Sequence, residues 1–442
     1  MRKDPGQSNV TPMQSSTTPD KASEKINKEL PVAGGGLLSR RSFITKTAGG
    51  SLFLPVSYAA GANFDRTPET WLKPGSEFSN YGTPPDNKEH PIRWISNHPA
   101  VPGEGVSWTP HHQLYGTITP NGLHFERHHN GVPHIDVSTW EVAVHGLADT
   151  PTAFSLDDLH RLPFHTRQLF IECGGNSNAM WQERPAQTAA GYIHGLMSCS
   201  EWTGVLLSDL LQRVGMDSDN TWIIADGLDS AGVTTSFPVE KAVDDALIAL
   251  YQNGEPIRPE QGYPARLILP GWEGIRQIKW LRSLQISNRP LLSKYDTVSY
   301  TELMPDGTFD RFSFAMDVKS FISQPSPGID LTQPGLYEIQ GLAWSGHGKI
   351  KRVEVSADGG TSWADAHLQE PVLDHSLVRF RIPWRWSGAP ASLLSRATDS
   401  QGNIQPDRKS VIASKGSNSY YHYNGDTVWS VEESGRIQHA YL

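Results

Sequence analysis

Residues 170–177 have the sequence Phe170-Ile171-Glu172-Cys173-Gly174-Gly175-Asn176-Ser177 and are the most informative stretch of the chain. The apolar run over residues 167–172 predicts a strand that ends at Cys173. The two glycines after it let other groups approach the backbone closely and leave the sulfur accessible. Such a cysteine suits a nucleophile or a soft metal ligand, because the thiolate is the reactive form. A buried structural cysteine is the alternative reading of the same residues.

Short strands and helices surround this stretch and predict a mixed α/β domain over residues 136–290. Ser155 is the expected N-cap of a short helix over residues 155–159. Residues 203–214 have apolar side chains at helical spacing and predict an amphipathic helix. The predicted strands cover residues 137–146, 167–172, 221–225 and 265–269.

The pattern changes to strands from about residue 315. Val353 and Val355 alternate with polar residues, and residues 378–382 repeat the pattern with Arg379 and Arg381 between apolar positions. Period-two alternation with polar residues outward predicts a β-sandwich. We place the junction between the two regions in residues 310–327.

Composition excludes several classes of protein. The 442 residues are 37% hydrophobic and 19% charged, which excludes a wholly disordered chain. The net charge of −9 argues against duplex nucleic acid as a partner, because phosphate binding needs a concentrated positive face. The only cysteines are Cys173 and Cys199, so neither a disulfide scaffold nor a C-x-x-C-H haem site is expected. No apolar run is long enough to span a membrane.

The N-terminal region has the features of an export signal. Residues 1–38 are polar and expected to be disordered, and Ser39-Arg40-Arg41-Ser42-Phe43 follows them. A short apolar run, residues 47–60, leads to a small-residue cleavage site at Ala60-Gly61-Ala62. We interpret this as a twin-arginine signal, which predicts a periplasmic protein exported already folded, with its cofactor inserted.

Four segments, in this order, resemble the sulfite oxidase family of molybdopterin oxidoreductases over roughly residues 90–430. The cysteine loop described above resembles the molybdenum-ligating loop of that family. The other three are Asn97-His98-Pro99-Ala100-Val101-Pro102, then Gln261-Gly262-Tyr263-Pro264-Ala265-Arg266 with Pro270-Gly271-Trp272-Glu273-Gly274, then Gln277-Ile278-Lys279-Trp280-Leu281. Each segment alone is a weak signal, whereas the ordered set is specific.

Three further segments are similar to the sulfane dehydrogenase (SoxC) branch of the family. They are residues 118–129, with Gly122-Leu123-His124-Phe125-Glu126-Arg127-His128-His129 at their end, Pro305-Asp306-Gly307, and Gly341-Leu342-Ala343-Trp344-Ser345-Gly346. The resemblance implies an α+β chain, in which a mixed α/β molybdopterin-binding domain precedes an immunoglobulin-like β-sandwich dimerisation domain. The expected domains are a disordered N-terminus with its signal (1–62), the oxidoreductase domain (63–310), the dimerisation domain (311–432) and a tail (433–442).

The resemblance also implies a molybdenum-molybdopterin cofactor, with Cys173 as the protein ligand of the metal and Tyr300 as a second catalytic residue. A buried phosphate needs Arg, Lys and backbone donors around it. The cofactor-binding residues implied are Asn97, His98, Asp229, Gln261, Arg266, Gln277 and Lys279. The family usually has His in place of Gln261.

Two departures from the family pattern bear on the substrate. Sulfite oxidases have Arg where this chain has Ser96 and Asn178. Guanidinium groups suit an oxyanion, so their loss favours a neutral or tethered sulfur. Arg396 is a candidate for another basic residue in the pocket.

The other histidines and the second cysteine receive structural interpretations. Histidines are frequent in residues 111–134 but have no metal-binding spacing, so we expect this stretch to line the entrance of the pocket. Cys199 has no partner other than Cys173 and is expected to be structural.

The predicted function is periplasmic oxidation of sulfane sulfur on a carrier-protein cysteine, in a thiosulfate-oxidation pathway. The chain has no haem or flavin motif, so an external electron carrier is expected, and the resemblance implies that this carrier is a c-type cytochrome. The expected assembly is a homodimer, or an α2β2 complex with the cytochrome. The alternatives are a sulfite dehydrogenase acting on free sulfite and, more distantly, a cofactor-free binding or scaffold protein.

Overall fold

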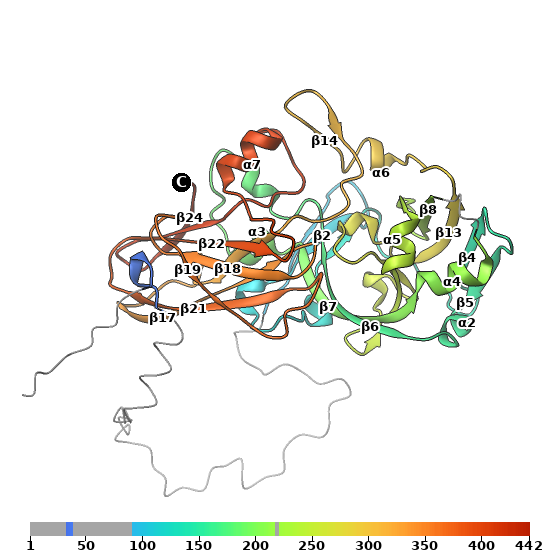
Figure 1. The fold of residues 1–442 in the computed structure, drawn as a ribbon, viewed down its shortest axis with the longest axis horizontal. Helices are drawn as coiled ribbons and strands as arrows, with labels where there is room; N and C mark the ends of the chain where they lie inside the picture. Colours follow the sequence, from blue (N-terminus) through green and yellow to red (C-terminus); the bar gives the residue numbers. More distant parts are fainter. Residues whose placement is uncertain (1–31, 39–90, 217–220) are drawn as a thin grey trace, which may run out of the picture. The chain divides into compact units, whose positions relative to one another are not determined.

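The computed structural model describes residues 32–38, 91–216 and 221–442, whose fold is drawn in Figure 1. The predicted twin-arginine signal, from Ser39 to Ala62, lies outside the described residues. Residues 32–38 were expected to be disordered, and this expectation is wrong. Leu37 is fully buried against Trp384 of the sandwich, whose indole donates to the carbonyl of Gly35 (2.6 Å).

The first sheet has five strands in the order β5-β4-β13-β8-β9. Figure 1 shows it in the part of the molecule away from the sandwich. β4 and β13 are parallel, and the other neighbours are antiparallel. The predicted N-cap is confirmed, because Ser155 and Asp158 form a capping box. The bounds are β4 (Glu141–Gly146), β5 (Thr152–Ser155), α2 (Leu156–His160), α4 (Leu207–Val214), β8 (Trp222–Gly227), β9 (Thr234–Pro238), α5 (Val239–Asp244) and β13 (Leu281–Ser287).

The second sheet presents the cysteine loop. Its order is β11-β10-β7-β6, and β12 also pairs with β10. The helix predicted over residues 203–214 is wrong in its first part: residues 203–206 continue β7 and only residues 207–214 are helical, because β7 pairs with both β6 and β10 there. The bounds are β6 (His165–Glu172), β7 (Met197–Leu206), β10 (Leu247–Gln252), β11 (Glu255–Pro256) and β12 (Arg266–Ile268).

A small sheet and single helical turns cover the edge of this domain. The small sheet has the order β1-β2-β3, and its outer strand β1 exposes all four of its side chains. The remaining elements are β1 (Trp94–Asn97), β2 (Gly105–Trp108), η3 (His111–Gln113), η4 (Asn121–Leu123), β3 (Glu126–His128), η5 (Asn178–Trp181), α3 (Ala190–His194), η6 (Pro259–Gln261), η7 (Gly274–Arg276) and α6 (Lys294–Thr297).

The C-terminal region is a sandwich of two sheets, in the orders β16-β17-β21-β20 and β19-β18-β22-β23-β24 (Figure 1). A hairpin of β14 and β15 precedes it. The predicted α+β fold, a mixed α/β domain followed by a sandwich, is therefore confirmed. The bounds are η1 (Gly34–Gly36), β14 (Glu302–Leu303), β15 (Phe309–Asp310), β16 (Lys319–Gln324), β17 (Gly335–Trp344), β18 (Ile350–Ser356), β19 (Ala364–Asp365), β20 (His367–Leu368), β21 (Val378–Trp386), β22 (Ala391–Asp399), α7 (Arg408–Lys415), β23 (Val428–Val431) and β24 (Ile437–Ala440).

Two expectations about the sandwich are wrong. Arg379 was expected to face outward but is fully buried, because the loop that contains Leu114 and Gly116 covers that face of the sheet. Its guanidinium donates to the carbonyls of Leu114 (3.0 Å) and Gly116 (2.9 Å) of the first domain. Residues 433–442 were expected to be a tail, yet they contain β24, which pairs with β23.

The residue after β24 reaches back to the cysteine loop region. The hydroxyl of Tyr441 donates to the carbonyl of Gln182 (3.1 Å), and its ring lies under the Arg408 guanidinium (3.8 Å to the ring centre). Arg408 donates to the carbonyls of Met180 (3.3 Å) and Gln182 (3.0 Å). The final strand therefore helps to hold residues 180–182, just after the cysteine loop.

Candidate functional site

A pocket opens beside the end of β6, between β3 and the loops that follow β11 and β12. It brings together most of the residues that the sequence singled out, although these lie far apart in the chain. The predicted residues that line it are Cys173, Asp229, Gln261, Arg266, Gln277, Lys279 and Tyr300. The pocket is also lined by Phe125, Arg127, His128, His129, Ile171, Val233, Gly274, Ile275, Ile278 and Trp280.

Two predicted cofactor residues are not brought to this pocket. Asn97 ends the exposed strand β1, and His98 follows it with its ring Nδ1 accepting from the amide of Ala100 (3.2 Å). Neither lines the pocket, and neither do Ser96 and Asn178. The sequence resemblance that selected Asn97 and His98 carried no information about the direction in which β1 faces.

The backbone around Cys173 is fixed from both sides. Its amide donates to the carbonyl of Leu196 (2.9 Å), and its carbonyl accepts from the amide of Asn176 (2.8 Å). A Cβ atom at position 174 would lie 1.9 Å from Oε1 of Glu273, so only glycine fits there. This tight turn presents the sulfur to the pocket. Burial raises the pKa of the Cys173 thiol to about 11 and so favours the protonated thiol. A bound cation would favour the thiolate instead.

The inner end of the pocket carries two buried cations. Arg266 is 5% exposed; its Nη1 donates to Gln261, while its Nε has no partner. Lys279 donates to the carbonyl of Arg127 (3.1 Å) and to Nδ1 of His128 (2.9 Å). Burial lowers the pKa of both cations, and the charge of Arg266 lowers that of Lys279 further.

Neither cation forms an ion pair with a carboxylate within the described part of the chain, and Oε1 of Gln277 also lacks a partner. Buried polar groups are normally satisfied, so the unpartnered Nε of Arg266 marks room for a ligand. The ammonium of Lys279 already has three acceptors, the third being the carbonyl of Glu260 (3.3 Å). An arginine stays protonated at neutral pH, which makes an anion the matching ligand. With a thiol at the other end, the pocket suits a group that joins a soft metal to a phosphate.

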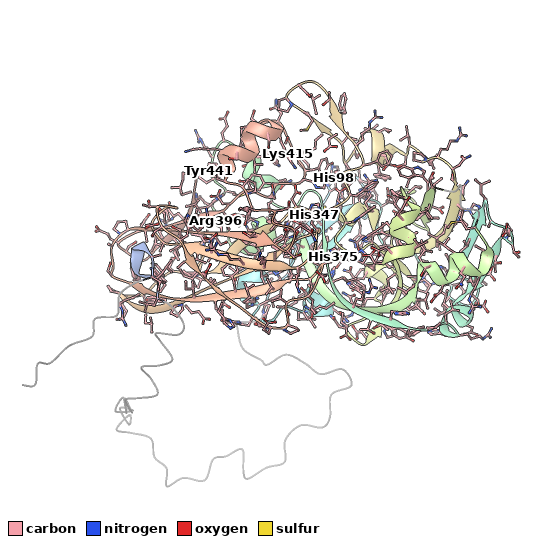
Figure 2. The ribbon with its side chains drawn as sticks, in the orientation of Figure 1. His98, His347, His375, Arg396, Lys415 and Tyr441 are labelled. Carbon is pink, nitrogen blue, oxygen red and sulfur yellow. The ribbon has the colours of Figure 1, made fainter. Side chains whose placement is uncertain are left out.

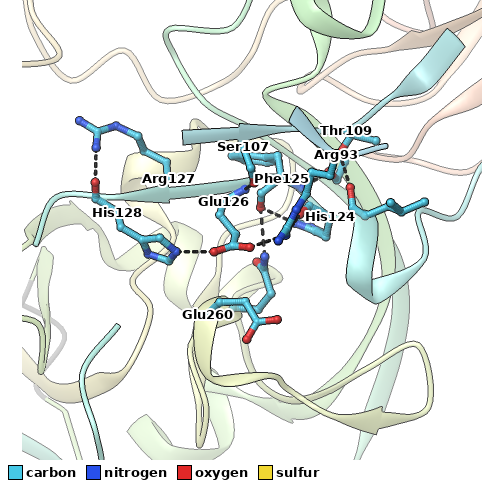
Figure 3. A network of polar contacts seen from close by, with 12 residues as sticks. Arg93, Ser107, Thr109, His124, Phe125, Glu126, Arg127, His128 and Glu260 are labelled. Carbon is cyan, nitrogen blue, oxygen red and sulfur yellow. Dashed lines mark hydrogen bonds and ion pairs between the residues drawn. The ribbon is translucent and has the colours of Figure 1, made fainter. Parts of the chain in front are cut away.

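The cysteine end of the pocket differs, because its arginine has a carboxylate partner. Figure 3 shows this network around β3. Arg127 pairs with Glu104 (3.1 Å) and also donates to the carbonyl of His128. His128 pairs with Glu126 (2.7 Å). Burial lowers the pKa of His129 to about 3, so that ring is neutral at physiological pH.

Sequence reasoning missed Arg127 as a pocket residue. The signal was present in the histidine-rich stretch, which was expected to line the entrance, and His128 and His129 do line the pocket. His111 does not: its ring bonds to the carbonyl of Met197 (2.8 Å) and packs edge-on against Phe321.

The sandwich domain covers the cysteine loop with residues 420–422, a segment that the sequence analysis did not select. The ring of Tyr421 stacks on Tyr300 with 5.0 Å between ring centres. The amide of His422 donates to the carbonyl of Gly174 (2.8 Å). Tyr420 lies beside Gly175, 3.5 Å from where a Cβ atom would be. The site is therefore built from both domains.

Arg396 was expected to be a basic residue of the pocket, and this expectation is wrong. It lies in β22 of the sandwich, where it pairs with Glu354 (2.9 Å) and stacks on Trp363. It lines a separate cavity in that domain, and Figure 2 shows it over the sandwich. Cys199 lies in β7, fully buried and opposite Phe170, as expected of a structural cysteine.

Comparison with known proteins agrees with these features. The family model of the oxidoreductase molybdopterin binding domain matches residues 129–295, and that of the Mo-co oxidoreductase dimerisation domain matches residues 311–426. The crystal structure of the sulfane dehydrogenase SoxCD from Paracoccus pantotrophus is similar with a TM-score of 0.80 and 37% identity. That match covers 84% of this chain and 97% of the other.

Curated relatives are longer proteins. Mitochondrial sulfite oxidase of Mus musculus is 30% identical over 321 residues, which are 67% of this chain and 59% of that enzyme. The NADH nitrate reductase of Ulva prolifera is 29% identical over 362 residues, which are 71% of this chain and 41% of that enzyme. The chain thus spans less than two thirds of the length of these relatives.

Proposed function

Because the chain belongs to the sulfite oxidase family of molybdopterin oxidoreductases, we propose that it oxidises sulfane sulfur held on the cysteine of a carrier protein. The reaction takes place in the periplasm, and the electrons leave to a c-type cytochrome. The match to a sulfane dehydrogenase over nearly all of that chain supports the substrate class, since identity is 37% there and 30% with the mouse sulfite oxidase.

A molybdenum-molybdopterin cofactor is the group that family membership implies, and the pocket residues fit it. Cys173 would ligate the metal, while Arg266 and Lys279 would hold the phosphate, with Gln277 beside them. When bound, this cofactor supplies two-electron transfer of an oxygen atom from water to sulfur. The chain itself orients the sulfur ligand, neutralises the phosphate and excludes water with the aromatic cover of Tyr421 on Tyr300.

The pairing of Arg127 with a carboxylate at the cysteine end is the observation that carries the choice of substrate. A free oxyanion needs unpaired donors, and Arg127 is already paired with Glu104. Ser96 and Asn178 place no guanidinium near the site. A sulfane group tethered to a carrier protein is held by that protein and does not depend on a charged donor in the pocket.

Sulfite dehydrogenase is the second candidate, and one observation favours it. Arg127 lies in the pocket close enough to lower the pKa of the Cys173 thiol, so one guanidinium is available if the pair with Glu104 opens. The resemblance to mitochondrial sulfite oxidases is the comparison that supports this alternative.

Location and assembly are parts of the same proposal. The twin-arginine pattern at Arg40 and Arg41 supports folded export, and the match to a dimerisation domain supports a homodimer. An α2β2 complex with the cytochrome would supply the external electron acceptor. Among the described residues, no helix has the length and apolar character needed to cross a bilayer.

The test uses the purified holoenzyme without its electron acceptor. The content of molybdenum and pterin is measured first. If neither is present in stoichiometric amount, the chain is a cofactor-free binding or scaffold protein. The enzyme is then mixed anaerobically with sulfite, thiosulfate or a carrier-protein persulfide while the molybdenum absorption is followed. Rapid reduction by the persulfide and slow reduction by sulfite is the expected result. Reduction by sulfite at least as fast as by the persulfide would establish the sulfite dehydrogenase instead.

A further inference from the structure

A buried carboxylate directly beside the cysteine loop is held by donors from both domains. Glu172 is 1% exposed. Its Oε1 accepts from Nδ2 of Asn176 (2.9 Å) and from the ammonium of Lys319 (3.2 Å). Its Oε2 accepts from the indole of Trp344 (2.6 Å). All three partners are N–H donors, so the arrangement fits the ionised carboxylate, which is acceptor-only.

The ammonium of Lys319 makes a second contact to the same loop. Its Nζ donates to Oγ of Ser177 (2.8 Å), a residue with a left-handed backbone (φ +66°) that non-glycine residues rarely adopt. Ser177 also bonds to the ring of His194 (2.7 Å). Lys319 is 2% exposed and lies at the start of β16, in the sandwich. The loop therefore depends on the second domain for its conformation.

We propose that Glu172 and Lys319 are positioning residues, which hold the Cys173 loop in register with the sandwich and set the electrostatic field at the sulfur. The pair is matched in charge and shielded from water. The Coulomb interaction between buried groups is strong, because the local dielectric is low. Glu172 directly precedes Cys173 in the chain and bonds to Asn176 of the same loop, which places its charge within electrostatic reach of the sulfur.

This inference rests on Cys173 being the metal ligand, which is part of the proposed function, but not on the identity of the substrate. Removing either member of the pair changes the local charge by one unit, in opposite directions. Lys319→Met leaves a negative charge beside the thiolate, which opposes reduction of the metal. Glu172→Gln leaves a positive charge, which favours it. A residue that only supported the fold would not produce shifts of opposite sign.

The experiment measures the reduction midpoint potential of the metal in the holoenzyme by mediated titration, without substrate. The potential is expected to fall in Lys319→Met, to rise in Glu172→Gln, and to return close to the wild-type value in the double variant. Shifts in the same direction in both single variants, or unchanged potentials, would overturn the proposal. The thiolate-to-metal absorption band should move with the potential.

A matched control and a second readout separate this role from general destabilisation. Arg396→Met removes one member of another ion pair in the sandwich, Arg396 with Glu354, away from the pocket. It should lower the melting temperature without moving the potential. If Lys319→Met does not fold, Glu172→Gln and the double variant still decide the outcome. Cofactor content is expected to fall several-fold in Lys319→Met and to recover in the double variant; failure to recover would contradict a charge-matched pair.

Discussion

The two ends of the pocket differ in how their positively charged side chains are paired. At the inner end, Arg266 and Lys279 are buried with no carboxylate partner among the described residues, and burial lowers the pKa of both. At the cysteine end, Arg127 is paired with Glu104. Unpaired buried charge destabilises the chain until a ligand neutralises it, whereas paired charge does not. The inner end therefore suits an anionic group that stays bound, and the cysteine end suits a substrate that binds and leaves.

The largest effect is expected from removing the sulfur. Cys173→Ser replaces a soft thiolate with a hard, weakly acidic hydroxyl, and we expect turnover to fall by more than about a hundredfold, since even outer partners of metal ligands contribute 10–100-fold. Arg266 and Lys279, which would hold the cofactor phosphate, lie at the other end, so pterin should remain bound. Steady-state turnover and pterin fluorescence measure the two effects.

The other cysteine is the control for this variant. Cys199→Ser changes a buried residue of β7 that does not line the pocket, so most activity should remain. A comparable loss of turnover in both variants would contradict the assignment of the ligand.

The next largest effect concerns the inner end. Arg266→Met should empty the protein of cofactor while making the cofactor-free chain more stable, by about 1–4 kcal/mol, because an unpaired buried charge is removed. Molybdenum content and urea unfolding of the cofactor-free chain are the measurements. Arg379→Met is the matched control: that buried guanidinium is satisfied by carbonyls, so its loss should destabilise. A loss of stability in both variants would mean that the charge of Arg266 is already compensated.

A smaller effect is expected at the cysteine end. Because Arg127 is paired with Glu104, Arg127→Gln should raise KM for residual sulfite use by less than about threefold, whereas the sulfite dehydrogenase alternative predicts a rise of about 10–100-fold from the loss of a charged hydrogen bond of about 1.5–3 kcal/mol. Turnover of the carrier persulfide should change by less than about threefold, which corresponds to less than about 0.7 kcal/mol. Arg161→Gln, an exposed arginine in the same domain, should change neither. Equal loss for both substrates would show that Arg127 serves the cofactor and not the substrate.

The smallest effect is on acid stability. Burial lowers the pKa of His111 to about 3, so below pH 6.5 the unfolded chain binds a proton that the folded chain does not. Stability contributed by this neutral ring is full above pH 6.5 and is lost as pH falls toward 3, by about 1.4 kcal/mol per pH unit. The slope of the unfolding free energy against pH, measured by urea unfolding at pH 7 and pH 5, should be smaller in His111→Gln than in the wild type. An unchanged slope would mean that this ring takes up its proton in the folded state.

Local signals were predictable from the sequence, and long-range ones were not. The strand that ends at Cys173 and the cap at Ser155 follow from neighbouring residues. The pocket residues from Asp229 to Tyr300 came from resemblance, and the fold gathers them. Arg379 was misjudged because its partners, Leu114 and Gly116, lie in another domain.

The cover over the cysteine loop, residues 420–422, could not be predicted for the same reason. Tyr421 and His422 meet Tyr300 and Gly174 only through the packing of the sandwich against the first domain. Lys319 gives no sign in the sequence that it reaches Glu172. The helix expected from residue 203 began late, because strand pairing overrode the helical spacing of residues 203–206.

The contacts of Tyr441 with the carbonyl of Gln182 have a consequence for the order of events during synthesis. A ribosome makes the chain from the N-terminus, and domains generally fold in that order. Here the segment that follows Cys173 gains its supports, Arg408 and Tyr441, only after the ribosome has translated the whole sandwich. The nascent first domain therefore waits with an incomplete site. Cofactor loading should follow synthesis of the sandwich, and a pulse-chase experiment should find pterin on chains that include the folded sandwich but not on nascent chains stalled before it.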